Sequence, residues 1–347
     1  MIAAGGTAGH VLPALAVADA LTERGVHVTF AGSPDRVEAQ LVPDAGYELD
    51  TFRIGGFPRQ PSPALVRALL RAGAAPRACR AILRKRRCDV VFGAGGYVAG
   101  PIVLAASSLR LPAALSEADA HLGLANRLAL PFARRVFLAY PLEGRSGERY
   151  RVVGRPIPAR ARVIPREVAR EIFELPPEGP VLLVAGALAG ARSINELVIE
   201  AFAEVGPAVL HISGERDYGA LKSRLRRDDY RLIPSTDRIG AAYSAADLVL
   251  ARAGSSVWEV AAAGKPAILV PYPFATADHQ AKNAAYFVRA GGAMMIRDLD
   301  LAEVPDRVRS LLDDPQRLER MGEAMLHAAK PNAAEEIAEG LIALARP

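Results

Sequence analysis

The segment with the clearest chemical potential is Gly5-Gly6-Thr7-Ala8-Gly9-His10, between a short apolar start and a helical pattern over Val11–Leu21. Glycines let a backbone approach a phosphate closely, and the first N–H groups of the following helix favour an anion. His10 adds a side chain that titrates near neutrality and can accept a proton. The segment indicates an anion cradle with an acid–base group at its rim. A tight strand-to-helix turn with no ligand also needs glycine.

Two further glycine turns follow other predicted strands. They are Gly93-Ala94-Gly95-Gly96-Tyr97 and Gly186-Ala187-Leu188-Ala189-Gly190-Ala191. None of the three turns spells the Gly-x-Gly-x-x-Gly dinucleotide fingerprint, and no Gly-Lys-Ser/Thr forms a nucleotide-hydrolysing P-loop. The sequence therefore disfavours nicotinamide chemistry and ATP hydrolysis.

A fourth turn, Arg252-Ala253-Gly254-Ser255-Ser256, leads from a predicted strand into a helical pattern that contains Glu259. A helix that begins at Ser255 or Ser256 directs N–H groups and a partial positive charge toward an anion such as a diphosphate. Ser256 and Glu259 are three residues apart, so they equally fit a capping box with a purely structural role. Both interpretations remain open.

A polar run, Asp278-His279-Gln280-Ala281-Lys282-Asn283, follows Pro271-Tyr272-Pro273. Its side chains could hold the hydroxyl groups of a sugar. The alternative is a polar loop in which Asp278 caps a helix.

Short apolar runs that alternate with helical patterns must position these turns. Such alternation predicts an α/β fold with parallel sheets and helices on both faces. The predicted strands are Val26–Ala31, Val90–Phe92, Ala113–Ser116, Arg135–Leu138, Val181–Ala185, Ala208–Ser213, Leu248–Ala251 and Ala267–Pro271.

Two prolines in Val153-Gly154-Arg155-Pro156-Ile157-Pro158 interrupt this pattern, after which the strand, glycine turn and helix layout repeats. The 347 residues fit two domains of ordinary size. We expect two doubly wound parallel-sheet domains, 1–155 and 156–347, facing across a cleft that holds the ligands. The helical segment Ala333–Leu344, within 332–347, could cross back to the first domain.

Composition bounds the class of protein. Half of the residues are hydrophobic and 23% are charged, which is typical of a globular chain. Val90–Leu109 lacks charge, but its glycines and Pro101 predict a buried strand, a turn and a helix rather than a membrane span. The apolar start has no Lys or Arg before Arg24, so we expect no secretion signal. Cys79 and Cys88 are expected to be inert thiols in a reducing compartment.

Charge is uneven along the chain, with about +8 over residues 1–155 and about −3 over the rest. Much of the excess lies in an amphipathic segment that could rest on an anionic membrane surface or form a solvated helix face. No aromatic stacking residues accompany these charges, which disfavours nucleic acid. The basic residues of the segment are Arg67, Arg71, Arg77, Arg80, Arg84, Lys85, Arg86 and Arg87.

Five motifs in chain order resemble the MurG glycosyltransferases. Each is weak alone, but the ordered set is specific and covers nearly the whole chain. The motifs are Gly5–His10 with Pro13-Ala14-Leu15-Ala16, Gly95-Gly96-Tyr97 with Pro101, Glu117-Ala118-Asp119 with Gly123–Arg127, the Glu259 segment, and His279-Gln280 with Asn283-Ala284.

The resemblance implies a GT-B architecture and an inverting transfer of N-acetylglucosamine. The donor is UDP-N-acetylglucosamine, the acceptor is undecaprenyl-linked lipid I, and the product is lipid II of peptidoglycan synthesis. The implied acceptor-binding residues are Gly6, Thr7, Gly9, Gly95, Gly96, Tyr97 and Asn126. The implied donor-binding residues are Arg155, Gly186, Gly190, Thr236, Ile239, Arg252, Ser255, Ser256, Glu259, Gln280 and Asn283.

Within the donor set, the resemblance implies a division of roles. It puts Arg252, Ser255 and Ser256 near the phosphates and Glu259 at the ribose. It puts Gln280 and Asn283 at the sugar, and Thr236 and Ile239 near the uracil.

The chain departs from the family pattern at several positions. Gly186–Ala191 replaces the usual Gly-Gly-Ser-Gln-Gly-Ala, so Leu188 and Ala189 stand where a hydroxyl and an amide are expected near the donor. Ala8 replaces a glycine. Ser116-Glu117-Ala118-Asp119 replaces His-Glu-Gln-Asn but keeps two carboxylates. Pro158 stands where many members have an arginine, which Arg155 or Arg160 could replace.

An inverting transfer needs a base for the attacking hydroxyl and a group that stabilises the departing UDP. His10 is the favoured base, Glu117 is its rival, and Asp119 could orient the acceptor. For the leaving group we expect helix N–H groups at Ser255 and Ser256 together with Arg252. We expect no metal and no cofactor, because a helix N-cap explains the single Asp-x-Asp, Asp298-Leu299-Asp300.

The expected partners are the two substrates and an anionic membrane, with no nucleic acid. The expected location is cytoplasmic, peripheral on the inner face of the cell membrane. Alternatives are another GT-B enzyme, such as a glycolipid synthase or a UDP-sugar epimerase, or a degenerate paralogue that binds without turnover.

Overall fold

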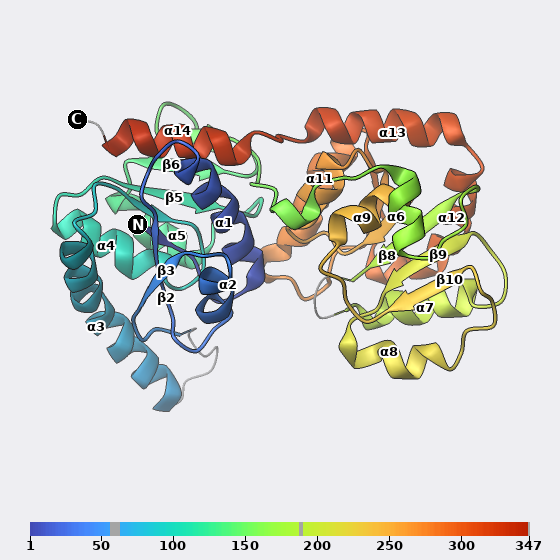
Figure 1. Cartoon of the computed structure of the whole chain (residues 1–347), viewed down its shortest axis with the longest axis horizontal. Coiled ribbons are helices and arrows are strands. Elements are labelled where there is room, and N and C mark those ends of the chain that lie inside the picture. Colours follow the sequence, from blue (N-terminus) through green and yellow to red (C-terminus); the bar gives the residue numbers. More distant parts are fainter. Residues whose placement is uncertain (56–62, 187–189, 346–347) are drawn as a thin grey trace. The chain divides into compact units, whose positions relative to one another are not determined.

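The computed structural model describes residues 1–55, 63–186 and 190–345, without the side chains of residues 63–72. The chain forms two compact units. Residues 1–158 with the segment from Pro331 onward make the first unit, and residues 159–330 make the second. Figure 1 shows that each unit has a sheet with helices packed on both faces.

In the described part of the first unit, seven parallel strands form one sheet in the order β3-β2-β1-β4-β5-β6-β7. The central strands are short and buried, whereas β3 and β7 at the two edges are partly exposed. The bounds are β1 Ile2–Ala3, β2 Thr29–Gly32, β3 Glu48–Thr51, β4 Val91–Gly93, β5 Ala113–Glu117, β6 Arg135–Leu138 and β7 Tyr150–Val152.

Helices connect these strands. They are α1 Ala8–Thr22, α2 Glu38–Asp44, α3 Pro63–Arg86, α4 Ala99–Ser108 and α5 Leu124–Ala129, followed by the 3-10 turn Leu130–Phe132. The last helix, α14 Ala333–Ala345, packs along α1 in this same unit (Figure 1). Ile337 and Leu341 of α14 share an apolar cluster with Val11 and Leu15 of α1.

The second unit repeats the plan. Its described part has six parallel strands in the order β10-β9-β8-β11-β12-β13. The bounds are β8 Val181–Ala185, β9 Ala208–Ile212, β10 Tyr230–Ile233, β11 Leu248–Ala251, β12 Ala267–Leu269 and β13 Ala293–Met295.

The described α-helices of the second unit range from 6 residues in α10 to 14 in α13. They are α6 Arg166–Ile172, α7 Arg192–Phe202, α8 Glu215–Lys222, α9 Ile239–Ala245, α10 Val257–Ala262, α11 His279–Arg289, α12 Val304–Leu312 and α13 Pro315–Ala328. The 3-10 turns are Ala159–Ala161, Thr276–Asp278 and Asp298–Glu303.

Each sheet reverses its strand order once, at β1/β4 in the first unit and at β8/β11 in the second. Ligands of open α/β sheets bind outside the carboxyl ends of the strands at such a point. All four glycine-containing turns singled out in the sequence follow these four strands. The topology therefore brings the turns together in two pairs, one pair in each unit.

The expected interpretation of Val90–Leu109 is confirmed, since this segment forms β4, a glycine turn and α4. Among the helices that the structure describes, none has the length and apolar character needed to cross a bilayer.

The basic segment of the sequence forms α3 and the turn after it. Arg67 and Arg71 fall among the side chains that are not described. The carboxyl end of α3 leads into β4, so Arg84–Arg87 lie at the sheet edge opposite to the His10 turn. There Arg86 donates to Asp50 at 2.6 Å and to Glu48 at 2.7 Å, so acidic neighbours compensate part of this charge.

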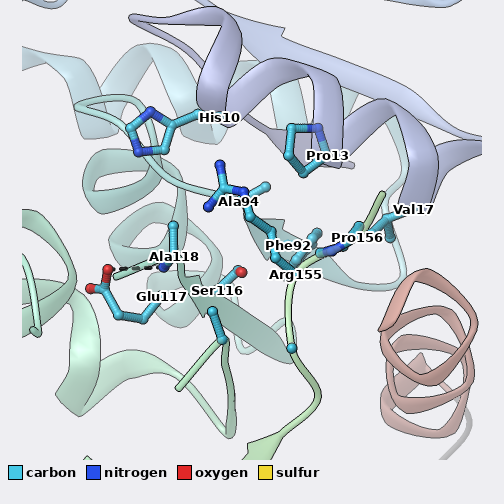
Figure 2. A pocket seen from close by; sticks show the side chains of 12 residues that line it. His10, Pro13, Val17, Phe92, Ala94, Ser116, Glu117, Ala118, Arg155 and Pro156 are labelled. Carbon is cyan, nitrogen blue, oxygen red and sulfur yellow. Dashed lines mark hydrogen bonds between the residues drawn. The ribbon is translucent and has the colours of Figure 1, made fainter. Parts of the chain in front are cut away.

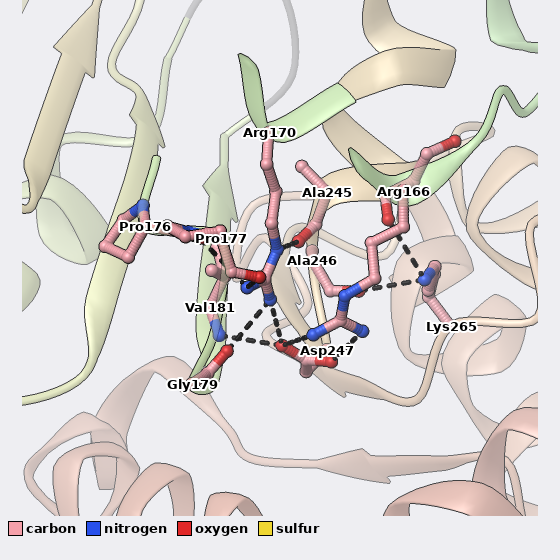
Figure 3. A network of polar contacts seen from close by, with 11 residues as sticks. Arg166, Arg170, Pro176, Pro177, Gly179, Val181, Ala245, Ala246, Asp247 and Lys265 are labelled. Carbon is pink, nitrogen blue, oxygen red and sulfur yellow. Dashed lines mark hydrogen bonds and ion pairs between the residues drawn. The ribbon is translucent and has the colours of Figure 1, made fainter. Parts of the chain in front are cut away.

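A partly buried ion-pair network joins α6 of the second unit to its sheet (Figure 3). Asp247, just before β11, accepts from Arg166 at 2.6 and 3.1 Å, from Arg170 at 3.0 Å and from the N–H of Val181 at 2.8 Å. Arg170 is 1% exposed and also donates to the carbonyls of Ala245, Pro176, Pro177 and Gly179. The network satisfies a guanidinium that would otherwise be costly to bury.

Candidate active site

The first and second glycine turns interlock at the β1/β4 switch point. Gly95 and Gly96 both have positive φ, +115° and +76°. A Cβ on Gly95 would collide with the His10 imidazole, and a Cβ on Gly96 would collide with the carbonyl of Gly5. Glycine is required here because each turn occupies the space that a side chain of the other would need.

His10 lies in the first turn of α1 and is half-buried. Its Nδ1 is 3.1 Å from Oγ1 of Thr7. Burial, followed by the nearby charge of Arg155, lowers the pKa of His10 to about 4, while the charge of Asp119 acts in the opposite direction. The imidazole is therefore neutral at pH 7 and able to accept a proton.

A small pocket lies beside His10 (Figure 2). Its free volume of about 20 Å³ is room for one or two water molecules. Polar groups on its wall are His10, Ser116, Glu117 and Arg155. The pocket thus joins the histidine to the carboxyl end of β5.

Glu117 is buried, and its carboxylate accepts four hydrogen bonds. Oε1 accepts from the N–H groups of Ala118 at 2.9 Å and Asp119 at 3.3 Å. Oε2 accepts from the N–H of Gly123 at 2.9 Å and from Nδ2 of Asn126 at 2.9 Å. Burial raises the pKa of Glu117. Because four donors use the acceptor sites of this carboxylate, the geometry favours His10 over Glu117 as the base.

Asn126 is a support as well. Besides Glu117, its amide binds the carbonyl of Ser116 at 2.9 Å, and the residue is 7% exposed. Together Glu117 and Asn126 shape the loop from β5 to α5, which carries Asp119. The acceptor-binding role of Asn126 stays a prediction, and its amide nitrogen is used within the protein.

Tyr97 and Arg155 complete the surroundings of the first turn. Tyr97 is 47% exposed, and a Cβ on Gly6 would lie 3.9 Å from its ring. Arg155 is 6% exposed and donates to the carbonyl of Gly9. The structure therefore groups Arg155 with the acceptor-side residues, whereas the other predicted donor-binding residues belong to the second unit.

In the second unit, Gly186 and Gly190 bracket the turn after β8. Gly190 has φ +72°, and a Cβ there would collide with the carbonyl of Ser213, while one on Gly186 would collide with Ala191. Leu188 and Ala189, the departures from the family pattern, lie outside the described residues.

Arg252, at the end of β11, is held by protein groups. It is 8% exposed, Nη1 donates to Oδ1 of Asp298 at 2.5 Å, and Nη2 donates to Oγ of Ser193 at 2.7 Å. Nη1 also reaches the carbonyls of Val270 and Pro271. The guanidinium is thus fixed beside the turn that contains Ser255 and Ser256.

The expected N-cap role of Asp298 is wrong. The 3-10 turn that begins there has Arg297 at its N-cap position, and Asp298 instead ties Arg252 to α7 through Ser193. Among the described residues, no group of three or more His, Cys, Asp or Glu side chains has the arrangement of a metal site.

Ser255 and Ser256 are half-exposed and precede α10. Ser256 occupies the N-cap position, but its side chain makes no capping hydrogen bond. Glu259 instead accepts a hydrogen bond from the hydroxyl of Tyr243 at 3.2 Å. The capping-box alternative is therefore wrong in this structure, and Glu259 keeps a half-exposed carboxylate in the second unit.

Tyr243 is buried, and burial together with the charge of Glu259 raises the pKa of its hydroxyl far above 10, while the charge of Arg160 lowers it. The hydroxyl therefore stays protonated and orients the Glu259 carboxylate. Arg160, and not Arg155, is the arginine that lies in this electrostatic environment.

Gln280 and Asn283 lie on the first turns of α11. Oε1 of Gln280 accepts the N–H of Tyr272 at 2.9 Å, which fixes the orientation of the amide. Asn283 is 0% exposed and donates to the carbonyl of Ala253 at 3.3 Å. Asn283 thus supports the turn after β11, whereas Gln280 is half-exposed. The alternative interpretation, a helix cap by the Asp278 side chain, is wrong, since this side chain makes no capping hydrogen bond.

Thr236 and Ile239 flank the start of α9. Oγ1 of Thr236 accepts the N–H of Arg238 at 3.0 Å, so the hydroxyl shapes the turn. Ile239 is the first residue of α9 and is half-exposed. This places both residues after the carboxyl end of β10.

Sequence reasoning missed Glu38, Tyr243 and Asp298. Each supports a predicted residue: Glu38 binds the N–H of Gly6 at 2.9 Å, Tyr243 binds Glu259, and Asp298 binds Arg252. Of the three, only Asp298 belongs to a motif considered in the sequence, the Asp-x-Asp at Asp298-Leu299-Asp300. The other two carry no spacing signal, because they come from elements far along the chain from their partners.

Comparison with known proteins shows the family of the chain. The chain matches the glycosyltransferase family 28 N-terminal domain over residues 1–138 and the family 28 C-terminal domain over residues 181–337. It is 42% identical to the UDP-N-acetylglucosamine–N-acetylmuramyl-(pentapeptide) pyrophosphoryl-undecaprenol N-acetylglucosamine transferase of Acidithiobacillus ferrooxidans, over 99% of this chain and 96% of the relative.

Solved structures share the architecture. The MurG of Acinetobacter baumannii aligns with a TM-score of 0.79 at 28% identity over 99% of each chain. A UDP-GlcNAc 2-epimerase from Neisseria meningitidis aligns with a TM-score of 0.69 at 14% identity over 99% of each chain, a likeness of fold alone. The expected GT-B architecture is confirmed, and the chain belongs to the MurG family of N-acetylglucosamine transferases.

Proposed function

We propose that this chain transfers N-acetylglucosamine from UDP-N-acetylglucosamine to the muramyl sugar of undecaprenyl-linked lipid I, with inversion, to form lipid II. The observation that carries the proposal is the placement of the His10 imidazole against two interlocked glycine turns. The names of relatives that match over nearly the whole chain supply the substrates.

The acceptor diphosphate binds at the β1/β4 switch point, where helix α1 begins. The start of a helix provides N–H groups and a partial positive charge for an anion. The N–H of Gly6 is already used by Glu38, so we expect the phosphate contacts to come from the amides that follow it and from the turn that contains Gly95 and Gly96.

His10 removes the proton from the attacking hydroxyl. In the tautomer that this role requires, Nδ1 carries the proton and faces Oγ1 of Thr7 at 3.1 Å, and Nε2 holds the lone pair that accepts the substrate proton. Asp119, whose charge acts to raise the pKa of His10, stabilises the imidazolium that forms. As the new glycosidic bond forms at the anomeric carbon, the bond to UDP breaks and the diphosphate takes the electron pair.

The leaving diphosphate is stabilised by the turn after β11. In the described hydrogen bonds, the N–H groups of Ser255 and Ser256 have no partner, and fixed amides cost no reorganisation during the reaction. Arg252 orients this turn and adds positive charge beside it. Glu259 binds the ribose and Gln280 binds the sugar.

The direct test is transfer of radiolabelled sugar from UDP-N-acetylglucosamine to a lipid I analogue by the purified chain. We expect a disaccharide product with the β configuration. Diacylglycerol as a competing acceptor distinguishes a glycolipid synthase. Epimerised UDP-sugar without an acceptor indicates an epimerase, and donor binding without product indicates a non-catalytic paralogue. Any of these three outcomes would overturn the proposal.

We further propose that the first unit rests peripherally on an anionic membrane at the cytoplasmic face. Three apolar side chains on the connection from β5 to β6 are exposed: Leu124 and Leu128 on α5, which begins at the same sheet edge as His10, and Phe132 on the 3-10 turn that follows. Arg127 is exposed on the same helix, and cationic residues beside apolar ones favour an anionic bilayer.

Sedimentation with vesicles tests this surface. Vesicles that contain phosphatidylglycerol should retain the wild-type chain, and Leu124→Asp with Leu128→Asp should reduce retention. Leu299→Asp, which changes a 97% exposed leucine of the second unit, is the control. Equal retention of all three proteins would contradict the assignment.

A further inference from the structure

Glu38 begins α2, and its carboxylate is inaccessible to solvent. Oε2 accepts the N–H of Gly6 at 2.9 Å, and Oε1 accepts the N–H of Ser33 at 3.0 Å. These amides belong to the turns that follow the neighbouring strands β1 and β2. A single buried carboxylate therefore joins the turn that precedes His10 to the next turn of the sheet.

Two glycines leave the space that Glu38 fills. A Cβ on Gly5 would collide with Oε1, and a Cβ on Gly32 would lie 2.7 Å from Cγ of Glu38. Neither glycine has a positive φ, so backbone conformation does not explain them. Their requirement comes from the close approach of this side chain.

A buried carboxylate is costly unless hydrogen bonds to its charged form compensate the lost hydration. Both described partners of Glu38 are backbone amides, and charge-assisted bonds of this kind are roughly twice as strong as neutral ones. The hydrogen bond to Oε2 directs the Gly6 N–H toward the buried Glu38 carboxylate. Gly6 is the residue before Thr7, whose hydroxyl contacts Nδ1 of His10.

We propose that Glu38 is a positioning residue for the acceptor reaction. By fixing the Gly6–Thr7 backbone it orients the Thr7 hydroxyl, and through it the His10 imidazole, and it sets the shape of the turn that meets the acceptor diphosphate. It touches no substrate. The identity of the acceptor rests on the function proposed above, but the link from Glu38 to His10 does not.

Glu38→Gln is the first test, because it keeps the shape of the side chain but places an N–H group against one of the two amides. Gly32→Ala is the second, because it displaces an intact Glu38 carboxylate without altering the glycine turn. Asp50→Asn is the control, since it weakens a carboxylate–arginine pair of the edge strand β3 that does not contact Glu38.

We expect both test variants to raise the acceptor KM about tenfold and to lower kcat, because a buried amide is left without its acceptor. The donor KM should stay within about twofold. Asp50→Asn should lower the melting temperature and leave both KM values unchanged. A purely structural Glu38 would make the test variants resemble this control, and that result would overturn the inference.

A spectroscopic arm separates this inference from the proposed function. In protein labelled at glycine nitrogen and at the histidine ring, Glu38→Gln and Gly32→Ala should shift the Gly6 amide and the His10 ring resonances, and Asp50→Asn should not. If the wild type transfers no sugar but these shifts appear, the function fails and the positioning role stands. Unshifted His10 resonances would remove the positioning role.

Discussion

Nη1 of Arg252 lies 2.5 Å from Oδ1 of Asp298, across 46 residues of sequence. The pair fixes a guanidinium that is 8% exposed beside the Ser255–Ser256 turn. Asp298 is the first carboxylate of the single Asp-x-Asp motif, and in this structure it pairs with an arginine. The same two residues therefore bear on both the donor site and the question of a metal.

Neutralising Asp298 should impair donor binding. Asp298→Asn weakens the charge-assisted bond that orients Arg252, so we expect the KM for UDP-N-acetylglucosamine to rise about tenfold with the acceptor KM unchanged. Asp300→Asn, in the same motif, is the matched control and should behave like the wild type. If Asp298 instead served a metal, a chelator would abolish wild-type transfer and manganese would restore it.

Removing the imidazole should slow the chemical step. His10→Ala should lower kcat about a hundredfold with little change in donor KM, as expected for loss of a general base. Since the pKa of His10 is lowered to about 4, the acid limb of the wild-type pH profile should lie well below pH 6.5. His27→Ala, an exposed histidine, is the control. Near-normal turnover of His10→Ala would remove His10 from the base role.

The Tyr243 hydroxyl should matter for the donor. Tyr243→Phe removes the bond that orients Glu259, so we expect a severalfold higher donor KM and a smaller change in kcat. Glu259→Ala should give a larger rise in KM than loss of stability. Tyr230→Phe, which loses a buried hydroxyl bond to His211 in the same unit, is the control. Equal KM values for the two phenylalanine variants would contradict the assignment.

Asp247 should be a stability determinant of the second unit. Asp247→Asn leaves the buried Arg170 without its carboxylate, and we expect a loss of about 3 kcal/mol of unfolding free energy. Asp229→Asn, which weakens the more exposed pair with Arg227, should cost at most about 1 kcal/mol. Urea unfolding followed by circular dichroism measures both. A loss for Asp247→Asn no greater than for Asp229→Asn would refute the ranking.

Acid should destabilise the second unit through His211. Burial lowers the pKa of His211 to about 3 from 6.5, so the unfolded state binds more protons than the folded state between these values. The contribution of neutral His211 to the unfolding free energy is therefore complete above pH 6.5 and declines as the pH falls toward 3. The unfolding free energy of His211→Gln should therefore change less between pH 6.5 and pH 4 than that of the wild type. Parallel curves would exclude this role.

Apart from the short β1 at the start of the chain, four observed strands were not predicted from the sequence: β3, β7, β10 and β13. They are the edge strands of the two sheets and are partly exposed, so they lack the continuous apolar signal of the central strands. The central strands were predicted because they are covered on both faces. Arg135–Leu138, Val181–Ala185 and Leu248–Ala251 match the observed bounds.

The sequence by itself determined the α/β class, the repeated strand–turn–helix plan and the glycine turns, because these depend on local spacing and on residues without side chains. Only the tertiary structure decided which of the predicted residues hydrogen-bond to other parts of the protein. Glu117 and Asn126 pair within the loop from β5 to α5, whereas Asn283 and Arg155 reach the carbonyls of Ala253 and Gly9 on loops far along the chain. Hydrogen bonds across strands depend on sheet order, which no local pattern in the chain encodes.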